Sequence, residues 1–430
     1  MLAFIAEEGA ITCATCAGHP PRFACRTCGS EEFLTGTHCG RCRLQVRIDD
    51  LIGADESASV ELTRLRAHLA DAPMDPRSVV SWLRRPHVAS TLKGMATGAL
   101  DVDHSALDLL TQGAATRYFR RLLIEAGVLP QIHVLQHELT LHVAALAGTL
   151  EPTSGNKLRR FYRWDILPKL HRRYRDRERD LSMEAFIGQR GHLAAVVRFL
   201  AWIDARGTLL GDLDQRTLDH YTARIKTREP VDHFVRWATK SRLAGDLATH
   251  DRAARNTMST MTEEELWRAT DLLLADESVE LEVRVAGLFV LLYAQLLGRA
   301  VSLTRDQINV TPEQVTVQFG VTPVVLDDRV GDLVRRQLSA EPRRGYAAGT
   351  SGWLFEGLSP GTHMTAAYIR LRLAELGIRS RVSRETRMNL LSMRMPSAVI
   401  ADVIGIGGHT ADRRKRNTGG TWSNYPELRS

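Results

Sequence analysis

The chain has 430 residues, of which 44% are hydrophobic and 25% charged, and its formal net charge is +7. This length predicts two to four domains, and the hydrophobic share is sufficient for sizeable folded cores. The longest apolar run, from Val285 to Gly298, is 14 residues long and contains Gln295. Because a helix needs about 20 apolar residues to cross a bilayer, this run predicts a buried helix, and we expect no membrane partner.

All six cysteines lie in the first 42 residues, as three Cys-x2-Cys pairs. Two such pairs supply four thiolates around one tetrahedral ion, and Cys25, Cys28, Cys39 and Cys42 have the spacing of a zinc ribbon. Gly29 follows Cys28 and Gly40 follows Cys39, where we expect turns that favour glycine. We therefore predict a structural Zn²⁺ in a module of residues 1–50.

The remaining pair, Cys13 and Cys16, is two ligands short of a second site. His19 and His38 could complete it, or the two thiols compete for the first ion or stay free. Met1 to Ala10 lacks a basic start and is interrupted by two glutamates, which argues against a signal peptide. With reduced thiols, a cytoplasmic and nucleoid-associated protein is expected.

Residues 51–145 show a helical pattern of leucines interrupted by Pro73, Pro76 and Pro86, which predicts a domain of short helices. Residues 146–250 predict a second helical domain. Its first part carries a basic stretch with interleaved aromatic residues, which fits phosphate contacts. The candidate DNA-binding residues here are Lys157, Arg159, Arg160, Arg163, Arg172 and Arg173. Acidic residues that alternate with the later arginines leave a solvated face with local ion pairs as the alternative.

The C-terminal part, residues 255–430, starts with a capping box at Thr262-x-x-Glu265. The alternation of Val315, Val317 and Phe319 with a turn at Gly320 predicts a small β hairpin or sheet. Helices are expected over about 363–376, 384–394 and 397–405. The fold class is therefore mainly α, with this small sheet and the N-terminal ribbon.

Several segments resemble the tyrosine recombinase (phage integrase) family, in a variant form with a cysteine-rich N-terminus like that of actinobacterial integrase-like proteins. Residues 150–250 look like its core-binding domain, and residues 255–430 look like its catalytic domain. Leu296-Leu-Gly-Arg-Ala-Val-Ser-Leu303 is similar to the first-arginine motif, and Arg381-Val-Ser-Arg384 falls at the His-x-x-Arg box. Tyr425 lies at the position of the nucleophile.

The resemblance implies that Arg299 and Arg384 hold a DNA phosphate while Tyr425 attacks it and forms a phosphotyrosyl link. Arg381 stands where the family has a histidine, and no lysine lies between Lys240 and Lys415. His409 or Trp422 could replace the third-box residue, and Lys415 could replace the general acid. The implied partners are double-stranded DNA and further copies of the chain assembled on it.

A second interpretation uses the same segment as a helix-turn-helix over residues 397–416. Ile400, Ile404 and Ala411 would be its packing positions, and the helix carrying Arg413, Arg414 and Arg416 would enter the major groove. In that case the protein is a catalytically inactive DNA-binding regulator or accessory factor. A third class, a zinc-dependent protein-interaction scaffold, would show no salt-sensitive DNA affinity.

Overall fold

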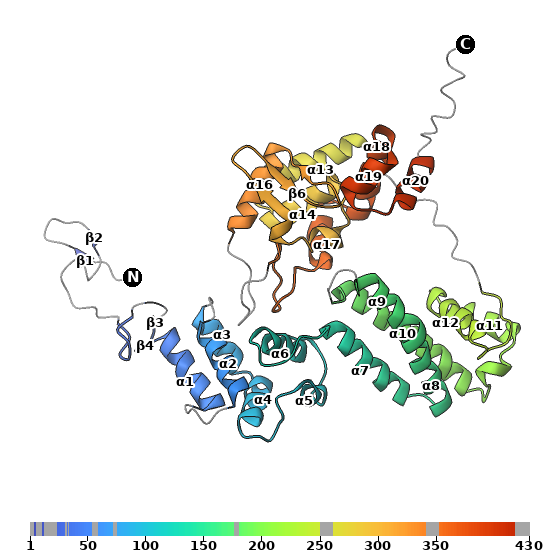
Figure 1. The fold of residues 1–430 in the computed structure, drawn as a ribbon, viewed down its shortest axis with the longest axis horizontal. Coiled ribbons are helices and arrows are strands. Elements are labelled where there is room, and N and C mark those ends of the chain that lie inside the picture. Colours follow the sequence, from blue (N-terminus) through green and yellow to red (C-terminus); the bar gives the residue numbers. More distant parts are fainter. Residues whose placement is uncertain are drawn as a thin grey trace, which may run out of the picture. The chain divides into compact units, whose positions relative to one another are not determined.

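We describe the protein from a computed structural model, which is mainly helical, as the sequence predicts (Figure 1). The described residues are 4–5, 11–12, 24–30, 32, 34–53, 59–71, 75–175, 180–249, 261–340 and 352–417. They form two compact units, one built mainly from residues up to Gln131 and one mainly from Ile132 onward. None of the helices in these ranges combines the length and the hydrophobicity that a bilayer crossing requires.

The first unit contains two two-stranded sheets, β1-β2 and β3-β4, and six helices that pack around one hydrophobic core. Leu65, Leu69 and Leu83 are fully buried in this core. Pro76 and Pro86 each begin a helix, where the missing N–H is not needed. The elements are β1 (Phe4–Ile5), β2 (Ile11–Thr12), β3 (Leu34–Thr35), β4 (His38–Cys39), α1 (Gly40–Ile52), α2 (Val60–Asp71), α3 (Pro76–Leu83), α4 (Pro86–Ala96), α5 (His104–Asp108) and α6 (Ala114–Glu125).

Residues 132–249 form a helical core around Phe161, Phe199 and Phe234, which are all fully buried. The first helix of this part belongs to the same core, so the packing changes near residue 131 and not near 145, where the sequence placed a boundary. The elements are α7 (Val134–Gly148), α8 (Pro152–Phe161), the π-helix η1 (Tyr162–Ile166), α9 (Leu167–Arg175), α10 (Met183–Asp204), η2 (Leu210–Asp212), α11 (Gln215–Thr222) and α12 (Glu229–Lys240).

Residues 261–417 surround helix α14, of which every residue from Val283 to Leu291 is buried. The predicted capping box of Thr262 and Glu265 begins α13. The elements are α13 (Glu263–Ala275), α14 (Leu281–Leu291), α15 (Leu297–Ala300), η3 (Arg305–Gln307), β5 (Ile308–Val310), β6 (Val315–Val317), β7 (Val324–Val325), α16 (Asp328–Ser339), α17 (Ala366–Glu375), α18 (Ser380–Arg394), α19 (Ser397–Ile404) and α20 (Gly408–Asn417).

The predicted small sheet is a three-stranded antiparallel sheet in the order β5-β6-β7. Ile308 pairs with Val317, and Thr316 pairs with Val325. Gly320 follows the second strand, but it has a further role there. A Cβ at Gly320 would lie 2.0 Å from the carbonyl oxygen of Asp402, so glycine allows the backbone after β6 to contact helix α19.

Candidate functional site

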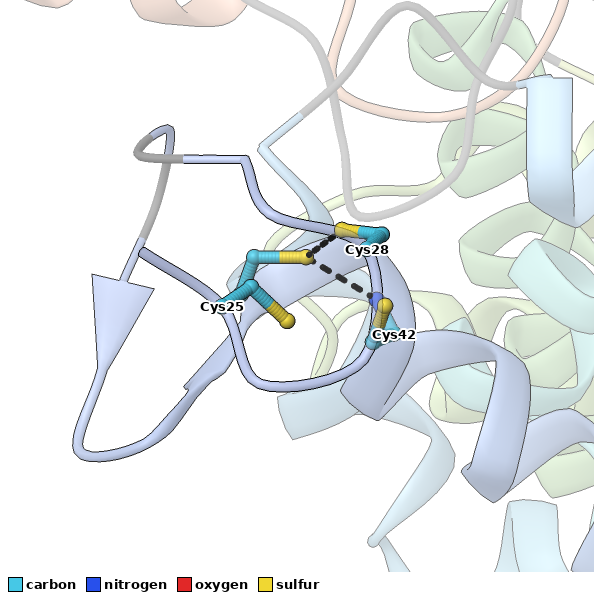
Figure 2. Close-up of side chains that lie close together, drawn as sticks. Cys25, Cys28 and Cys42 are labelled. Atoms are coloured by element: carbon cyan, nitrogen blue, oxygen red, sulfur yellow. Dashed lines mark hydrogen bonds between the residues drawn. The ribbon is translucent and has the colours of Figure 1, made fainter. Parts of the chain in front are cut away.

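Four cysteine sulfurs form a cluster at the start of the first unit. The Sγ atoms of Cys25, Cys28, Cys39 and Cys42 all lie within 4.8 Å of one another. The Sγ atoms of Cys28 and Cys39 are 3.5 Å apart. Figure 2 shows the thiols of Cys25, Cys28 and Cys42 directed toward the same small volume. Four sulfurs at this separation match the donor set of a tetrahedral metal ion.

The two Cys-x2-Cys pairs are held by different local structures. The first pair lies on a turn in which the Gly29 N–H donates to the Cys25 carbonyl at 2.9 Å, and Gly29 has the predicted left-handed conformation with φ 73°. The second pair begins helix α1, where the Cys39 sulfur caps the helix by accepting from the Cys42 N–H at 3.4 Å. Gly40 is the first residue of that helix, so it does not lie in the glycine-favouring turn that we expected there.

The electrostatics of the cluster favour a thiolate at Cys25 and oppose one at Cys42. Backbone N–H bonds, that of Cys39 first, lower the pKa of Cys25 to about 5. The neighbouring sulfurs, Cys28 first, raise the pKa of Cys42 to about 12. Crowded sulfurs therefore need a bound cation to lose all of their protons. Cys13, Cys16 and His19 lie outside the described residues, and His38 is exposed with its Nδ1 3.0 Å from the Thr37 hydroxyl.

The second candidate site lies where helix α14 ends. The expected long helix stops at Leu291 because Ala294 has a left-handed backbone conformation with φ 51°, which is uncommon for a residue with a Cβ. Two arginines of α18 hold this turn. The Nε–H of Arg384 donates to the Ala294 carbonyl, and the Nε–H of Arg387 donates to the Leu292 carbonyl, both at 2.8 Å. A strained turn fixed in this way is typical of functional sites.

Arg299 reaches the same region from helix α15. Its guanidinium donates to the carbonyl of Gly405, the residue that ends helix α19 in a left-handed conformation. Ala294 and Ile404 share one small apolar cluster, so the carbonyls that Arg384 and Arg299 contact are neighbours in space. Two arginines that are 85 positions apart in the sequence are therefore brought together.

Positive charge exceeds negative charge around Arg384. Burial is the first cause that lowers the pKa of this guanidinium, and the charges of Arg414 and Arg299 act in the same direction. Glu385 opposes them; it accepts two hydrogen bonds from Arg414, one of them at 2.8 Å, and its side chain is 10% exposed. The three guanidiniums and the carboxylate of Glu385 together have a net charge of 3 − 1 = +2. An anion would relieve this repulsion in a partly buried site.

A pocket of about 790 Å³ adjoins Arg299. Its wall includes Gln295, Gln307 and the turn of residues 405–408 between α19 and α20. The turn supplies backbone rather than bulky side chains, because Gly405, Gly407 and Gly408 are three of its four residues. The wall also includes the carboxylate of Asp402, so one arginine, one acid, two amides and exposed main chain line a pocket that suits a polar ligand.

The other predicted catalytic residues are distributed as follows. Tyr425 and Trp422 lie outside the described residues, so their distances to the arginines are not described. Arg381 is exposed on α18, and His409 is exposed at the start of α20. The Nζ of Lys415 is 3.4 Å from the Met395 carbonyl. Sequence reasoning missed Glu385 and Arg387, although both stand within three positions of Arg384.

Helices α19 and α20 form a short helical pair at the end of the described chain. Ile400, Ile404 and Ala411 are its buried packing positions, as the second interpretation expects. Arg413 and Arg416 are exposed on α20, whereas Arg414 is bound to Glu385. This pair therefore presents two of its three predicted arginines to solvent.

The predicted basic stretch lies on α8, η1 and α9. Arg159, Arg160, Arg163 and Arg172 are exposed, and Lys157 is half-buried. The side chain of Arg173 is outside the described set. Trp164 is 68% exposed, and the Arg163 guanidinium is 5.7 Å from its ring centre. These residues form a cationic and aromatic surface, which we call the α8 surface.

Comparisons with known proteins give a limited result. No family model and no curated protein matches the chain. The solved structures that resemble it include two with a TM-score of 0.41 each. One is a pre-cleavage complex of the XerH site-specific recombinase with its difH substrate, at 13% identity over 67% of this chain and 96% of that chain. The other is a post-cleavage complex with palindromic difH, at 12% identity over 68% and 96%. Likenesses this distant establish no activity for this chain.

Proposed function

We propose that this chain binds duplex DNA and breaks and rejoins its strands through a phosphotyrosyl intermediate. The observation that carries the proposal is the convergence of Arg299 and Arg384 at one site with excess positive charge. A phosphodiester has two non-bridging oxygens that accept bonds from guanidiniums, and it would neutralise part of that excess. Its binding would require both guanidiniums to turn some donors from backbone carbonyls toward the ligand.

In the proposed reaction, the Tyr425 hydroxyl attacks the phosphorus atom of a strand. The new Tyr Oη–P bond forms and the hydroxyl proton is released to solvent as the P–O bond to the deoxyribose breaks, and the leaving oxygen takes up a proton. The phosphodiester count is conserved, so rejoining by the reverse reaction needs no nucleotide. Arg299 and Arg384 stabilise the charge that develops on the phosphoryl oxygens, and Lys415 is the proposed proton donor.

Further copies of the chain would assemble on paired DNA sites. The α8 surface and the exposed arginines of α20 are the proposed contacts to the DNA backbone and groove. The four clustered cysteines would hold a structural Zn²⁺, because their donor set and mutual distances fit this ion. The ion would join the turn that carries Cys25 and Cys28 to the N-terminus of α1. It would thereby order the β3-β4 hairpin between them.

A second candidate function is DNA binding without strand cleavage. The specific observation in its favour is the helical pair of α19 and α20, with a buried Ala411 and exposed arginines at 413 and 416. A further observation is that Arg299 and Arg384 already have carbonyl partners. In this case the arginines would be structural, and α20 would read the DNA.

A suicide substrate separates the two functions. Duplex DNA is recovered with the protein from its own cells, and a nick is introduced near the cleavage site. The cleaved strand end then diffuses away, so the covalent adduct accumulates. The proposal expects an adduct with the native chain, none with Tyr425→Phe, and an undiminished adduct with Tyr368→Phe as the matched control. Salt-dependent binding of the same duplexes without an adduct supports the second function and refutes the first.

A further inference from the structure

A second cavity lies in the helical part formed by residues 132–249, far along the chain from the arginine site. It has a volume of about 490 Å³, is open to solvent on one side, and is lined by α10, α11, the loop before α12 and the first turn of α12. Ligand pockets in proteins typically have volumes of about 300–1,000 Å³. Gly188 and Gly191 form part of its wall on α10, and a Cβ built on either would meet no atom within 4 Å. The cavity is thus large enough for a small organic ligand.

Two cations line this cavity without a protein partner. Arg198 on α10 and Lys226 on the loop before α12 are exposed, and within the described chain neither makes a hydrogen bond or an ion pair. The lining acid is Glu229, which lies 3.8 Å from His192. Burial, followed by the charge of His233, lowers the pKa of His192 to about 4, so this ring is neutral at pH 7. The net charge of the lining is 2 − 1 = +1, which favours an anion.

A tyrosine whose hydroxyl has no hydrogen-bond partner among the described residues also lines the cavity. Tyr221 is 8% exposed, and its ring packs between Phe199 and Trp202 with ring centres 5.0 and 4.9 Å away. No described residue forms a hydrogen bond with its hydroxyl. Arg198 is close enough for its charge to lower the pKa of Tyr221, although burial raises it more. The phenolic O–H is therefore available to donate to a ligand oxygen.

We propose that this cavity binds a phosphate group of a nucleotide-sized ligand through Arg198, Lys226 and Tyr221. Ile225, Pro230 and Val231 supply an apolar wall for the uncharged part of that ligand. The first turn of α12 also contributes to the wall, but Glu229 and Asp232 in that turn already face the positive end of its helix dipole. The same chemistry could instead receive a phosphate of a DNA strand, and the experiment distinguishes the two sources. The inference does not require strand cleavage by the protein.

The test uses the full-length protein and titration calorimetry with adenosine 5′-monophosphate and with inorganic phosphate. Arg198→Gln is expected to weaken nucleotide binding by about ten- to 100-fold, because it removes a charge-assisted bond. Tyr221→Phe keeps the ring packing and is expected to weaken it by about three- to tenfold. Arg190→Gln is the matched control, because Arg190 is exposed on the same helix but does not line the cavity. Duplex affinity and its salt dependence are measured for the same variants.

Nucleotide binding that is lost in Arg198→Gln and Tyr221→Phe but retained in the control supports a free ligand. If the nucleotide does not bind, but these two variants lose duplex affinity beyond the loss in the control, the phosphate comes from DNA. Nucleotide binding that none of the variants changes refutes the inference. It is equally refuted if the native protein binds no nucleotide and the variants bind duplex as the control does. A protein that binds nucleotide but no DNA would refute the proposed function and leave this site standing.

Discussion

Replacing His192 with glutamine is expected to reduce the acid sensitivity of the helical part formed by residues 132–249. The His192 ring lies between α10 and α12, and its side chain is 13% exposed. Its Nε2 is 3.2 Å from the Nδ1 of His233. The charged groups that face the pair are Asp165, Lys169 and Glu229, with Asp165 2.8 Å from the other nitrogen of His233.

The direction of the pKa shift of His192 determines whether acid raises or lowers the stability. Burial, the largest cause, lowers the pKa of His192 from 6.5 to about 4 in the folded protein. As the pH falls below 6.5, the unfolded chain therefore binds a proton before the folded chain does. The stabilising effect is complete above about pH 6.5 and is lost between about pH 6.5 and pH 4. The loss of unfolding free energy is about 3 kcal/mol at most, and roughly 2 kcal/mol of it occurs between pH 7 and pH 5.

Hydrogen exchange of α10 and α12 peptides, followed by mass spectrometry at pH 7 and pH 5, measures the free energy of opening for this part. In the native protein this free energy should fall with acid, and the fall should be smaller by roughly 2 kcal/mol in His192→Gln. Burial also lowers the pKa of His233, so some acid sensitivity should remain. His220→Gln, an exposed position in the same part, should keep the native response. An equal or steeper fall in His192→Gln would contradict the reasoning.

Three further predictions follow from the same structure. Cys39→Ser should reduce bound zinc from about one ion per chain to almost none by elemental analysis, whereas zinc retained at the native level would refute the four-sulfur site. Arg413→Gln with Arg416→Gln should reduce the slope of log affinity against log salt by about 2 in duplex titrations, and an unchanged slope would exclude α20 from the contact. Gly320→Ala should lower the urea midpoint, at a cost of roughly 1–3 kcal/mol, because its Cβ would overlap the Asp402 carbonyl; native stability would show that the chain can shift there.

Much of the local structure could be predicted because it depends on near neighbours in sequence. The capping box at Thr262, the small sheet after residue 307 and the thiol cluster all follow from spacings of a few residues. Ile400 and Ala411 were also placed correctly as packing positions. In each case the periodicity or the ligand chemistry leaves few alternatives.

What could not be predicted depends on contacts between distant segments. No glycine or proline marks the turn at Ala294 that ends the long apolar helix. Arginines from α18 stabilise this turn through its carbonyls, and that contact cannot be read from the local sequence. The role of Gly320 depends on helix α19, which is some 80 positions later in the sequence. The cation-lined cavity beside Tyr221 escaped notice because Arg198 and Lys226 resemble ordinary surface charges until the fold brings them together.

The most direct measurement of the proposed function identifies the residue that carries the DNA. Protein trapped on the suicide substrate is digested with nuclease and protease, and the peptide that retains a nucleotide is sequenced by mass spectrometry. The account predicts a single phosphotyrosyl residue, Tyr425, and loss of the adduct when Arg299 or Arg384 is replaced by glutamine. A nucleotide on another residue, or an adduct that forms equally well in both arginine variants, would contradict it.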